Sequence, residues 1–555
     1  MFDRNTIIAI VLIFLIFVGW SFFSQPAPQE PGTAAPTDST RVPGVDSSVT
    51  TNPATTTASQ MPATFDSLAV ATDSIPEKLI TVETRTFTAV LTNKGAGIEK
   101  FTFRNYKYSD GKMVEMLPEE AQPVPTVLST ISGFSDHEIT YSSGDGDINL
   151  SAGSGTQTIT YSAQIPGKGE ITKQFTFYPD KYDFEFVLKV NGVQQLGLDK
   201  EYILAWTPGI PPSEKDLSDD FSHYKAVAFM GGELQTEDSF ENGKLVKDIT
   251  GDAKWVGSHS KYFAFAFLPD NLNSNGAYFR GYERNRVSTD GNYNERGISA
   301  GIIMPTGANQ SIENRFKLFV GPLDYHLLKS YNTDLEDLID WGWKIIRPFS
   351  HAIYWITYQL HKFIPNYGLV IIFVAVLIKL VTFPLTRKSL KSMAAMKNLA
   401  PKMEELKVKY KSDPQKLNQS IMKLYKDEGV NPFSGCLLLL PQMPLLYGLY
   451  NVFRSTIEFR QAYFMPLWPD LSLPDPFPYY LPIVMTVAMF FQQKMSVTDP
   501  KQKVLVYLMP VMFFFFMKGL PVGLVLYWTM YSILSIGEQL IIKRSTPPVL
   551  NPQVK

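Results

Sequence analysis

The chain has 555 residues, more than one hydrophobic core usually organises, so at least two domains are expected. A net charge of -2 gives no overall attraction to nucleic acid, and one cysteine, Cys436, excludes an intrachain disulfide and a cysteine-based metal cluster. The 45 % hydrophobic content is the average of a polar part and a very apolar part of the chain.

Residues 1–24 are predicted to be a membrane anchor that is not cleaved. The run 7–23 is almost entirely apolar, and Trp20 lies where an interfacial aromatic residue is expected. A cleaved signal peptide is the alternative, but the apolar run exceeds a signal core and no Ala-x-Ala site follows it directly. Residues 25–76 are rich in Pro, Thr, Ser and Ala, which predicts a flexible tether.

Residues 77–330 have the alternating pattern of β-strands. After the Pro179-Asp180 turn, even positions up to Val190 are apolar and most odd positions are polar. So long a stretch of strands, broken by Gly, Asn, Asp and Pro, predicts a large antiparallel sandwich. No phosphate loop, nucleophile elbow or zinc-protease motif is present. Three isolated histidines are interpreted as surface or hydrogen-bonded side chains: His137, His223 and His259.

Residues 335–365 are predicted to form an amphipathic helix that lies in the membrane interface. Aromatic residues alternate with charged ones, and Trp355 belongs to the apolar set. Pro348, near the middle of the segment, argues against a membrane span. A helix packed in a protein core is the alternative.

Six apolar stretches are candidate membrane spans. They are the anchor and the stretches near residues 367–385, 434–453, 479–493, 504–517 and 520–542. The 386–430 loop carries eleven Lys and Arg against five acidic residues, so the positive-inside rule predicts that it is cytoplasmic. With six spans, the N terminus and the 545–555 tail are then cytoplasmic too, and the β domain is outside.

Two of these stretches are short for a membrane span. The 13 residues from Tyr479 to Phe491 would form about 20 Å of helix, and the 14 residues from Val504 to Met517 about 21 Å. A hydrocarbon core is about 30 Å thick. Short helices are expected to thin the bilayer, which lowers the barrier to moving a polar segment across it.

Lys379 lies inside the 367–385 stretch and requires an explanation. A cation near the middle of a bilayer costs about 2.5 to 3.5 kcal/mol on insertion scales. We therefore predict a functional residue that faces a wet space lined by protein. The alternative is that its ammonium extends toward the interface near Arg387, eight residues further on.

The basic loop is predicted to form a cytoplasmic helical hairpin over residues 387–428. Apolar residues recur at helical spacing on both sides of a helix start at Ser412-Asp413-Pro414. The two apolar stripes either pack on each other or leave a Met-rich surface partly open for varied apolar clients. The client contacts would then include Met393, Met396 and Met403.

A series of ordered motifs runs through residues 340–544. The motifs are Pro384-Leu385-Thr386, Pro401-Lys402, Leu424-Tyr425-Lys426, Val430-Asn431-Pro432, Gln442-Met443-Pro444, Phe490-Phe491-Gln492-Gln493-Lys494-Met495, Met509-Pro510 and Gly523-Leu524-Val525-Leu526-Tyr527-Trp528. They resemble the YidC membrane protein insertase family. Trp255-Val256-Gly257 and Phe319-Val320-Gly321-Pro322 are similar to the large periplasmic domain of its Gram-negative members.

The resemblance implies a polytopic α-helical membrane protein with a five-helix insertase core in residues 366–544 and an all-β periplasmic supersandwich. It implies an insertase and chaperone of the bacterial inner membrane, with a hydrophilic groove open to the cytoplasm and lipid. The family's groove arginine lies five residues before the proline of the Pro-Leu-Thr motif, which is Lys379 here. Matching positions put five further residues on groove or client-contacting surfaces: Gln442, Met485, Met489, Tyr527 and Trp528.

The implied partners are nascent membrane proteins, the Sec translocon and membrane lipids, with the ribosome and signal recognition particle pathway as further candidates. No enzymatic activity, cofactor, metal or direct recognition of nucleic acid is expected. Lysine keeps the charge of the family's arginine and loses its bidentate fork, which leaves a role based on charge and hydration. Acidic client residues would be favoured beside Lys379.

Two other functions remain as alternatives. One is a secondary transporter that uses Lys379 as a substrate counter-ion, although no inverted repeat or paired broken helices are visible. The other is an outer-face protein whose β domain binds a sugar and whose spans act only as an anchor.

Overall fold

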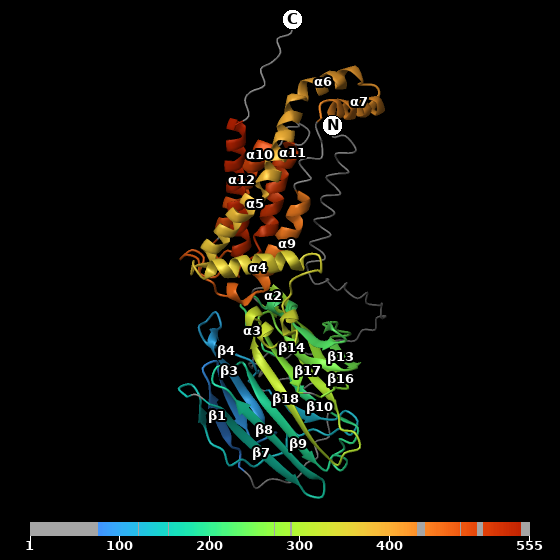
Figure 1. Ribbon diagram of the computed structural model, residues 1–555, viewed down its shortest axis with the longest axis vertical. Helices are drawn as coiled ribbons and strands as arrows, with labels where there is room; N and C mark the ends of the chain where they lie inside the picture. Colours follow the sequence, from blue (N-terminus) through green and yellow to red (C-terminus); the bar gives the residue numbers. More distant parts are fainter. Residues whose placement is uncertain are drawn as a thin grey trace, which may run out of the picture.

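The computed structural model describes residues 76–119, 121–153, 155–270, 272–288, 291–429, 439–477, 479–496 and 503–545. The predicted anchor, nearly all of the predicted linker, Cys436 and the chain after Ser545 lie outside the described residues. A β region and a helical region follow each other along the long axis of the molecule, and helix α4 lies across the boundary between them (Figure 1).

The described strands form three sheets. The first has the order β4 (Met113–Glu115), β3 (Gly97–Lys107), β2 (Phe87–Thr92), β1 (Leu79–Glu83), β6 (Ile148–Asn149). The second has the order β13 (Lys244–Thr250), β16 (Gly276–Ser288), β17 (Gly291–Pro305), β10 (Glu201–Trp206), β5 (Thr126–Leu128). The eight-stranded third sheet has the order β12 (Glu233–Glu237), β11 (Lys225–Met230), β14 (Ala253–His259), β15 (Phe263–Pro269), β18 (Ser311–Pro322), β9 (Asp183–Asn191), β8 (Gly169–Phe177), β7 (Gln157–Ile165).

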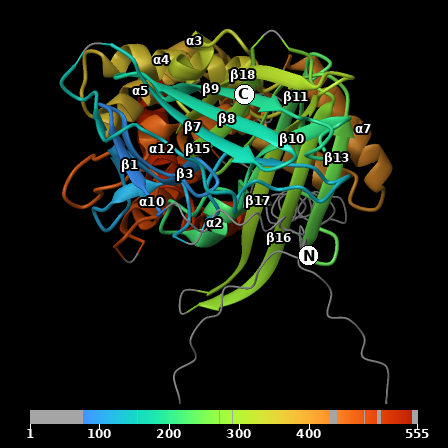
Figure 2. The ribbon, with the colours of Figure 1, turned by 90° about the horizontal axis from the view of Figure 1, so that it is seen from below.

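The prediction of a large β region is confirmed, and its strands pair almost throughout in antiparallel fashion. Within the described residues, β1 and β6 form the one parallel pair of strands. The β16–β17 hairpin is the longest, and Figure 2 shows its tip extending beyond the rest of the sheets.

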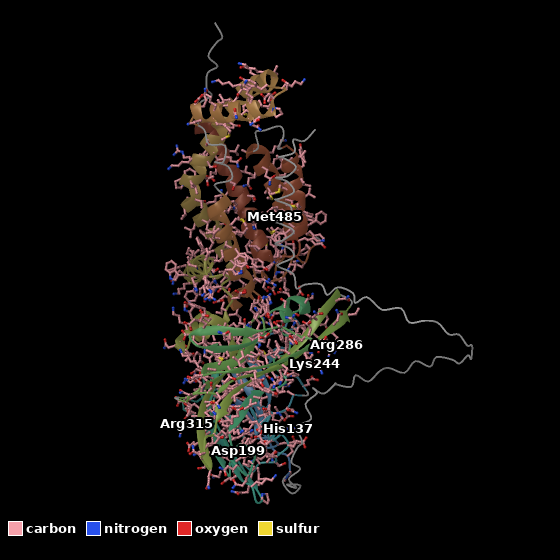
Figure 3. All side chains as sticks on the ribbon, turned by 90° about the vertical axis from the view of Figure 1, so that its right-hand side faces the viewer. His137, Asp199, Lys244, Arg286, Arg315 and Met485 are labelled. Carbon is pink, nitrogen blue, oxygen red and sulfur yellow. The ribbon has the colours of Figure 1, made fainter. Side chains whose placement is uncertain are left out.

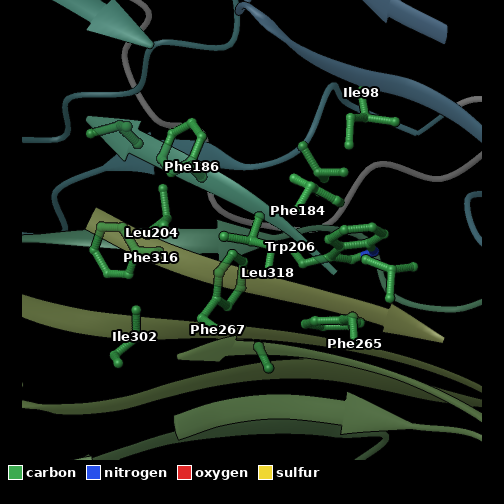
Figure 4. Packing of buried hydrophobic residues seen from close by; sticks show 14 of the residues in the cluster. Ile98, Phe184, Phe186, Leu204, Trp206, Phe265, Phe267, Ile302, Phe316 and Leu318 are labelled. Atoms are coloured by element: carbon green, nitrogen blue, oxygen red, sulfur yellow. The ribbon is translucent and has the colours of Figure 1, made fainter. Parts of the chain in front are cut away.

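The alternation predicted for β9 creates the core of this region. Phe184 and Phe186 are completely buried, and Phe186 lies opposite Phe316 of β18. Trp206 of β10 stacks on Phe265 of β15 with ring centroids 4.8 Å apart, so two sheets meet face to face (Figure 4). Each fully buried side chain of this size contributes about 1.5 to 3 kcal/mol, which explains why the strand pattern fixes which face turns inward.

The three histidines interpreted from the sequence each make a local hydrogen bond. His137 contacts the Ser135 hydroxyl at 2.8 Å, and the His223 ring contacts the Asp219 carbonyl at 2.7 Å. His259 contacts the Ser260 carbonyl at 2.8 Å. These contacts agree with the interpretation that the histidines are structural.

The described helices have the following bounds. In the β region and at the boundary are α2 (Leu217–Ser222), α3 (Tyr325–Ser330), η1 (Leu335–Leu338), α4 (Arg347–His361) and η2 (Ile457–Phe459). In the helical region are α5 (Tyr367–Asn398), α6 (Ala400–Lys409), α7 (Pro414–Asp427), α9 (Leu439–Ser455), α10 (Tyr480–Ser496), α11 (Lys503–Met517) and α12 (Val522–Ser545).

The structure supports fewer spans by length than the six predicted. Among the described helices, two are long and apolar enough to cross a membrane, at Tyr367–Leu390 and Val522–Ile542. Helices α9 and α10 have 17 residues each and α11 has 15, below the about 20 residues of a usual span. The candidate span in the N-terminal anchor lies outside the described residues.

Helix α5 is longer than the predicted 367–385 span, because it continues through Pro384 as far as Asn398. Proline removes one backbone donor from the helix, and nearby hydroxyls bond to carbonyls of the preceding turn. Thr382 donates to the Ile378 carbonyl at 2.9 Å, and Thr386 to the Thr382 carbonyl at 3.0 Å. The first arm of the predicted hairpin is therefore an extension of the span, followed by a break at Leu399 and by α6.

The predicted interfacial helix is divided into η1 and α4. Pro348 lies in the first turn of α4, where its missing N–H leaves no helical hydrogen bond unmade, so it starts this helix instead of interrupting one. One face of α4 is buried through Ile353 and Tyr354, and Trp355 on another face is 62 % exposed. This one-sided burial is typical of an amphipathic helix at a boundary.

Ion pairs join the β region to the helical region. Arg454 at the end of α9 contacts Asp219 of α2, which also accepts a hydrogen bond from Lys261 at 2.7 Å. Burial alone would raise the pKa of Asp219, but Lys261 and Arg454 hold it well below its usual range. Further along, Arg460 donates to Glu214 at 2.6 Å, and both side chains are buried.

Candidate functional site

Lys379 lies on α5 and forms an ion pair with Glu538 of α12. Its Nζ donates to Glu538 Oε2 at 2.9 Å, and the two side chains are 10 % and 6 % exposed. The ammonium also lies 4.2 Å from the centroid of the Tyr531 ring. A charge-assisted hydrogen bond and a cation–π contact therefore hold a neutral pair among apolar helices.

The helical repeat explains why these groups converge. Tyr531 and Glu538 are seven residues apart on α12, so they lie on one face of the helix, and α12 packs along α5. Gln442 of α9 forms a side-chain hydrogen bond with Tyr531. Three helices thus bring together a cation, an acid, a phenol and an amide, which can bind a polar or charged group inside an apolar bundle.

One carboxylate oxygen of Glu538 has unused capacity to accept hydrogen bonds. Oε1 is buried and has no hydrogen-bond partner within the part of the chain that the structure describes. An ionised carboxylate offers about four acceptor positions, and leaving a buried acceptor unsatisfied costs about 1 to 3 kcal/mol. The pair is therefore held by a single direct hydrogen bond.

Four of the predicted contact residues lie in the apolar cluster next to this pair. Met485 of α10 and Tyr527 of α12 are 1 % and 2 % exposed, so other side chains cover them. Met489 and Trp528 are half-buried against the same cluster. Figure 3 places Met485 among the helices and His137 in the β region. Direct contact of these residues with clients stays a prediction.

In the predicted hairpin, α6 and α7 lie at the end of the helical region farthest from the sheets (Figure 1). The Tyr425 hydroxyl of α7 donates to Met403 Sδ of α6 at 3.0 Å, and Lys402 pairs with Glu428 at 2.6 Å. These contacts favour packing of the two stripes on each other. Met393 and Met396 lie on the last turns of α5, and their side chains are outside the described set.

Sequence reasoning missed Glu538 and Tyr531. Glu538 is an acidic residue within the apolar 520–542 stretch, so the rule that drew attention to Lys379 could have found it. The pairing of the two could not be predicted, because it depends on how α5 and α12 pack. The structure directs the ammonium of Lys379 sideways to α12, whereas the alternative interpretation directed it along the helix toward Arg387.

Comparisons with known proteins cover both regions of the chain. A family described as YidC periplasmic domain matches residues 79–359, and one described as 60Kd inner membrane protein matches residues 359–548. Membrane protein insertase YidC of Chlorobaculum tepidum is 34 % identical over 566 residues, which cover 97 % of this chain and 94 % of that protein.

The protein of the same name from Prosthecochloris aestuarii is 33 % identical over 582 residues, which cover 100 % of this chain and 97 % of that protein. A crystal structure of an active YidC insertase with its first transmembrane domain resolved aligns at 19 % identity, with a TM-score of 0.35 over 83 % of this chain and 92 % of that one. With both family matches and relatives that cover its length, the chain belongs to the YidC membrane protein insertase family.

Proposed function

We propose that this protein inserts hydrophobic segments of client proteins into a bacterial inner membrane, the activity that the names of its relatives state. The site that receives the polar part of a client is the polar cluster of α5, α9 and α12. The observation that carries this assignment is the buried pair of Lys379 and Glu538. Charges inside apolar helices are costly, so those that are present usually mark a functional site.

The cluster can hold the polar end of a client during its transfer. A client carboxylate beside Lys379 would be attracted far more strongly than in water, since the surrounding helices lower the local dielectric constant. The Gln442 amide and the Tyr531 hydroxyl add uncharged hydrogen-bonding groups for client backbone. Burial of the client's apolar segment in lipid would supply the driving force.

The dimensions of the helices support local thinning of the bilayer. We propose that α9, α10 and α11 cross the membrane with α5 and α12, and that the N-terminal anchor completes six spans. Helix α10 is about 26 Å long and α11 about 23 Å, against a hydrocarbon core of about 30 Å. Helix α4, with Trp355 exposed, would lie in the outer interface, and the β region would be periplasmic.

The partners follow from this arrangement. The α6–α7 hairpin carries basic residues on the cytoplasmic side, where a nascent membrane protein first arrives. Its exposed apolar side chains, Val408 and Met422, are available for transient contact. The Sec translocon, the ribosome and the signal recognition particle pathway are further proposed partners, and chaperoning of inserted helices is a further proposed activity.

Insertion by the purified protein tests the proposal. Vesicles that contain it should protect the translocated tail of a reporter protein from added protease, and protein-free vesicles should not. The double variant Lys379→Ala/Glu538→Gln, which leaves no unpaired carboxylate, should lose insertion of clients with acidic tails. Lys362→Ala serves as the matched control, because this exposed lysine donates to Gln359 at the end of α4.

Two outcomes would contradict the proposal. One is that vesicles with the protein protect no more reporter than protein-free vesicles. The other is solute uptake that depends on Lys379 in the absence of insertion, which would favour the transporter alternative.

A further inference from the structure

The ion pair leaves Lys379 electrically neutralised in the structure. Glu538 Oε2 is the one hydrogen-bond acceptor that contacts its Nζ among the described residues. A client with an acidic residue therefore meets a cation that already has an anionic partner.

We propose that Glu538 is a specificity-determining residue. It stays paired with Lys379 until a carboxylate of the client replaces it in the ion pair. This inference rests on the insertase function proposed above, and it adds that insertion selects clients by a competition between two carboxylates. Glu538 acts through Lys379, so it is a positioning residue.

The geometry makes the exchange possible. Glu538 engages Lys379 through one oxygen only, and Oε1 has no partner within the described residues. The ammonium has three donors, so a second carboxylate can bind before the first one leaves. Tyr531 lies against the ammonium and keeps it in place during the exchange.

A purely structural pair predicts a different behaviour. If Glu538 only neutralises Lys379 to permit folding, its loss lowers insertion of all clients in parallel. If Glu538 competes with clients, its loss changes the ratio between clients that differ only in charge. This ratio separates the two roles because both clients are processed by the same folded molecules.

The experiment uses the full chain in vesicles and two reporters whose translocated tails carry either two Asp or two Asn at the same positions. The readout is the ratio of protease-protected Asp reporter to protected Asn reporter. For Glu538→Gln we expect this ratio to rise about tenfold over the natural protein, equivalent to about 1.4 kcal/mol. For Lys379→Gln/Glu538→Gln it should fall below that of the natural protein, since no cation remains.

A matched control and a second variant make the result decisive. Glu458→Gln also removes a buried carboxylate, one that accepts a hydrogen bond from Tyr354, and it should leave the ratio unchanged. If Glu538→Gln does not fold, Glu538→Asp weakens the same contact with the charge retained, and its ratio should rise above that of the natural protein.

A ratio that stays the same or falls in Glu538→Gln, or in Glu538→Asp where it replaces that variant, would overturn the inference. A ratio that rises equally in Glu458→Gln would overturn it as well. Failure of the proposed function is distinguishable, because it would abolish insertion of both reporters by the natural protein.

Discussion

Replacing Lys379 by methionine tests how much the buried ion pair with Glu538 contributes to the free energy of unfolding. The side chain keeps its approximate length and loses its charge, so Glu538 remains as a carboxylate that is 6 % exposed without its partner. Removal of one member of a buried pair costs about 3 to 5 kcal/mol, because the other charge is left uncompensated. The Tyr531 contact with the ammonium adds up to about 2 kcal/mol.

The companion variant is Lys379→Met/Glu538→Gln, in which neither charge remains. Replacement of both partners of a buried pair is often close to neutral. We therefore expect the single variant to unfold about 3 to 7 kcal/mol more easily than the natural protein, and the double variant to recover the about 3 to 5 kcal/mol that the uncompensated charge costs. Loss of intrinsic tryptophan fluorescence in denaturant, for protein in detergent micelles, measures the difference. Equal destabilisation of the single and double variants would refute the reasoning.

Two further predictions concern the junction between the β region and the helices. Arg454→Met should destabilise this junction by about 1 to 3 kcal/mol, less than the loss of a fully buried pair, because Asp219 still has Lys261 as a partner. Limited proteolysis should then release the β region faster. An unchanged cleavage rate would contradict this prediction. Burial raises the pKa of Glu458 to about 7 from an ordinary 4.5, so the folded protein binds the extra proton and gains stability as the pH falls from 7 toward 4.5. The free energy of unfolding of the natural protein should therefore be higher at pH 5 than at pH 8, and Glu458→Gln should remove about 2 to 3 kcal/mol of this difference. An unaltered pH dependence in the variant would contradict this prediction.

The sequence was sufficient for elements that a local pattern determines. The alternation around Phe184 and Phe186 predicted β9 and its buried face, and Asp413 before Pro414 predicted the start of α7, where the Asp413 side chain caps Lys416 N–H. Helix α5 extends beyond the predicted 367–385 stretch, because it continues through Pro384 to Asn398.

Two members of the polar cluster were predicted: Lys379 from the residues themselves, and Gln442 of α9 from the family resemblance. Lys379 was identified from the cost of a charge in an apolar run, but its partner lies 159 residues away on another helix. Local sequence patterns do not determine how α12 is rotated about its own axis, and this rotation turns Glu538 toward α5. For the same reason they could not predict how far neighbouring side chains enclose a methionine such as Met485.

The lysine at position 379 gains a physical meaning from its pairing with Glu538. A guanidinium can bind both oxygens of a carboxylate in a planar, bidentate arrangement, whereas the ammonium of Lys379 binds one and leaves Oε1 without a partner among the described residues. Lys379→Arg should therefore tighten the internal pair and make it harder for a client to displace. We expect this variant to insert the Asn reporter normally and the Asp reporter less well, with the loss reversed by adding Glu538→Gln. Equal insertion of both reporters by Lys379→Arg at the level of the natural protein would show that the strength of the internal pair does not limit selection.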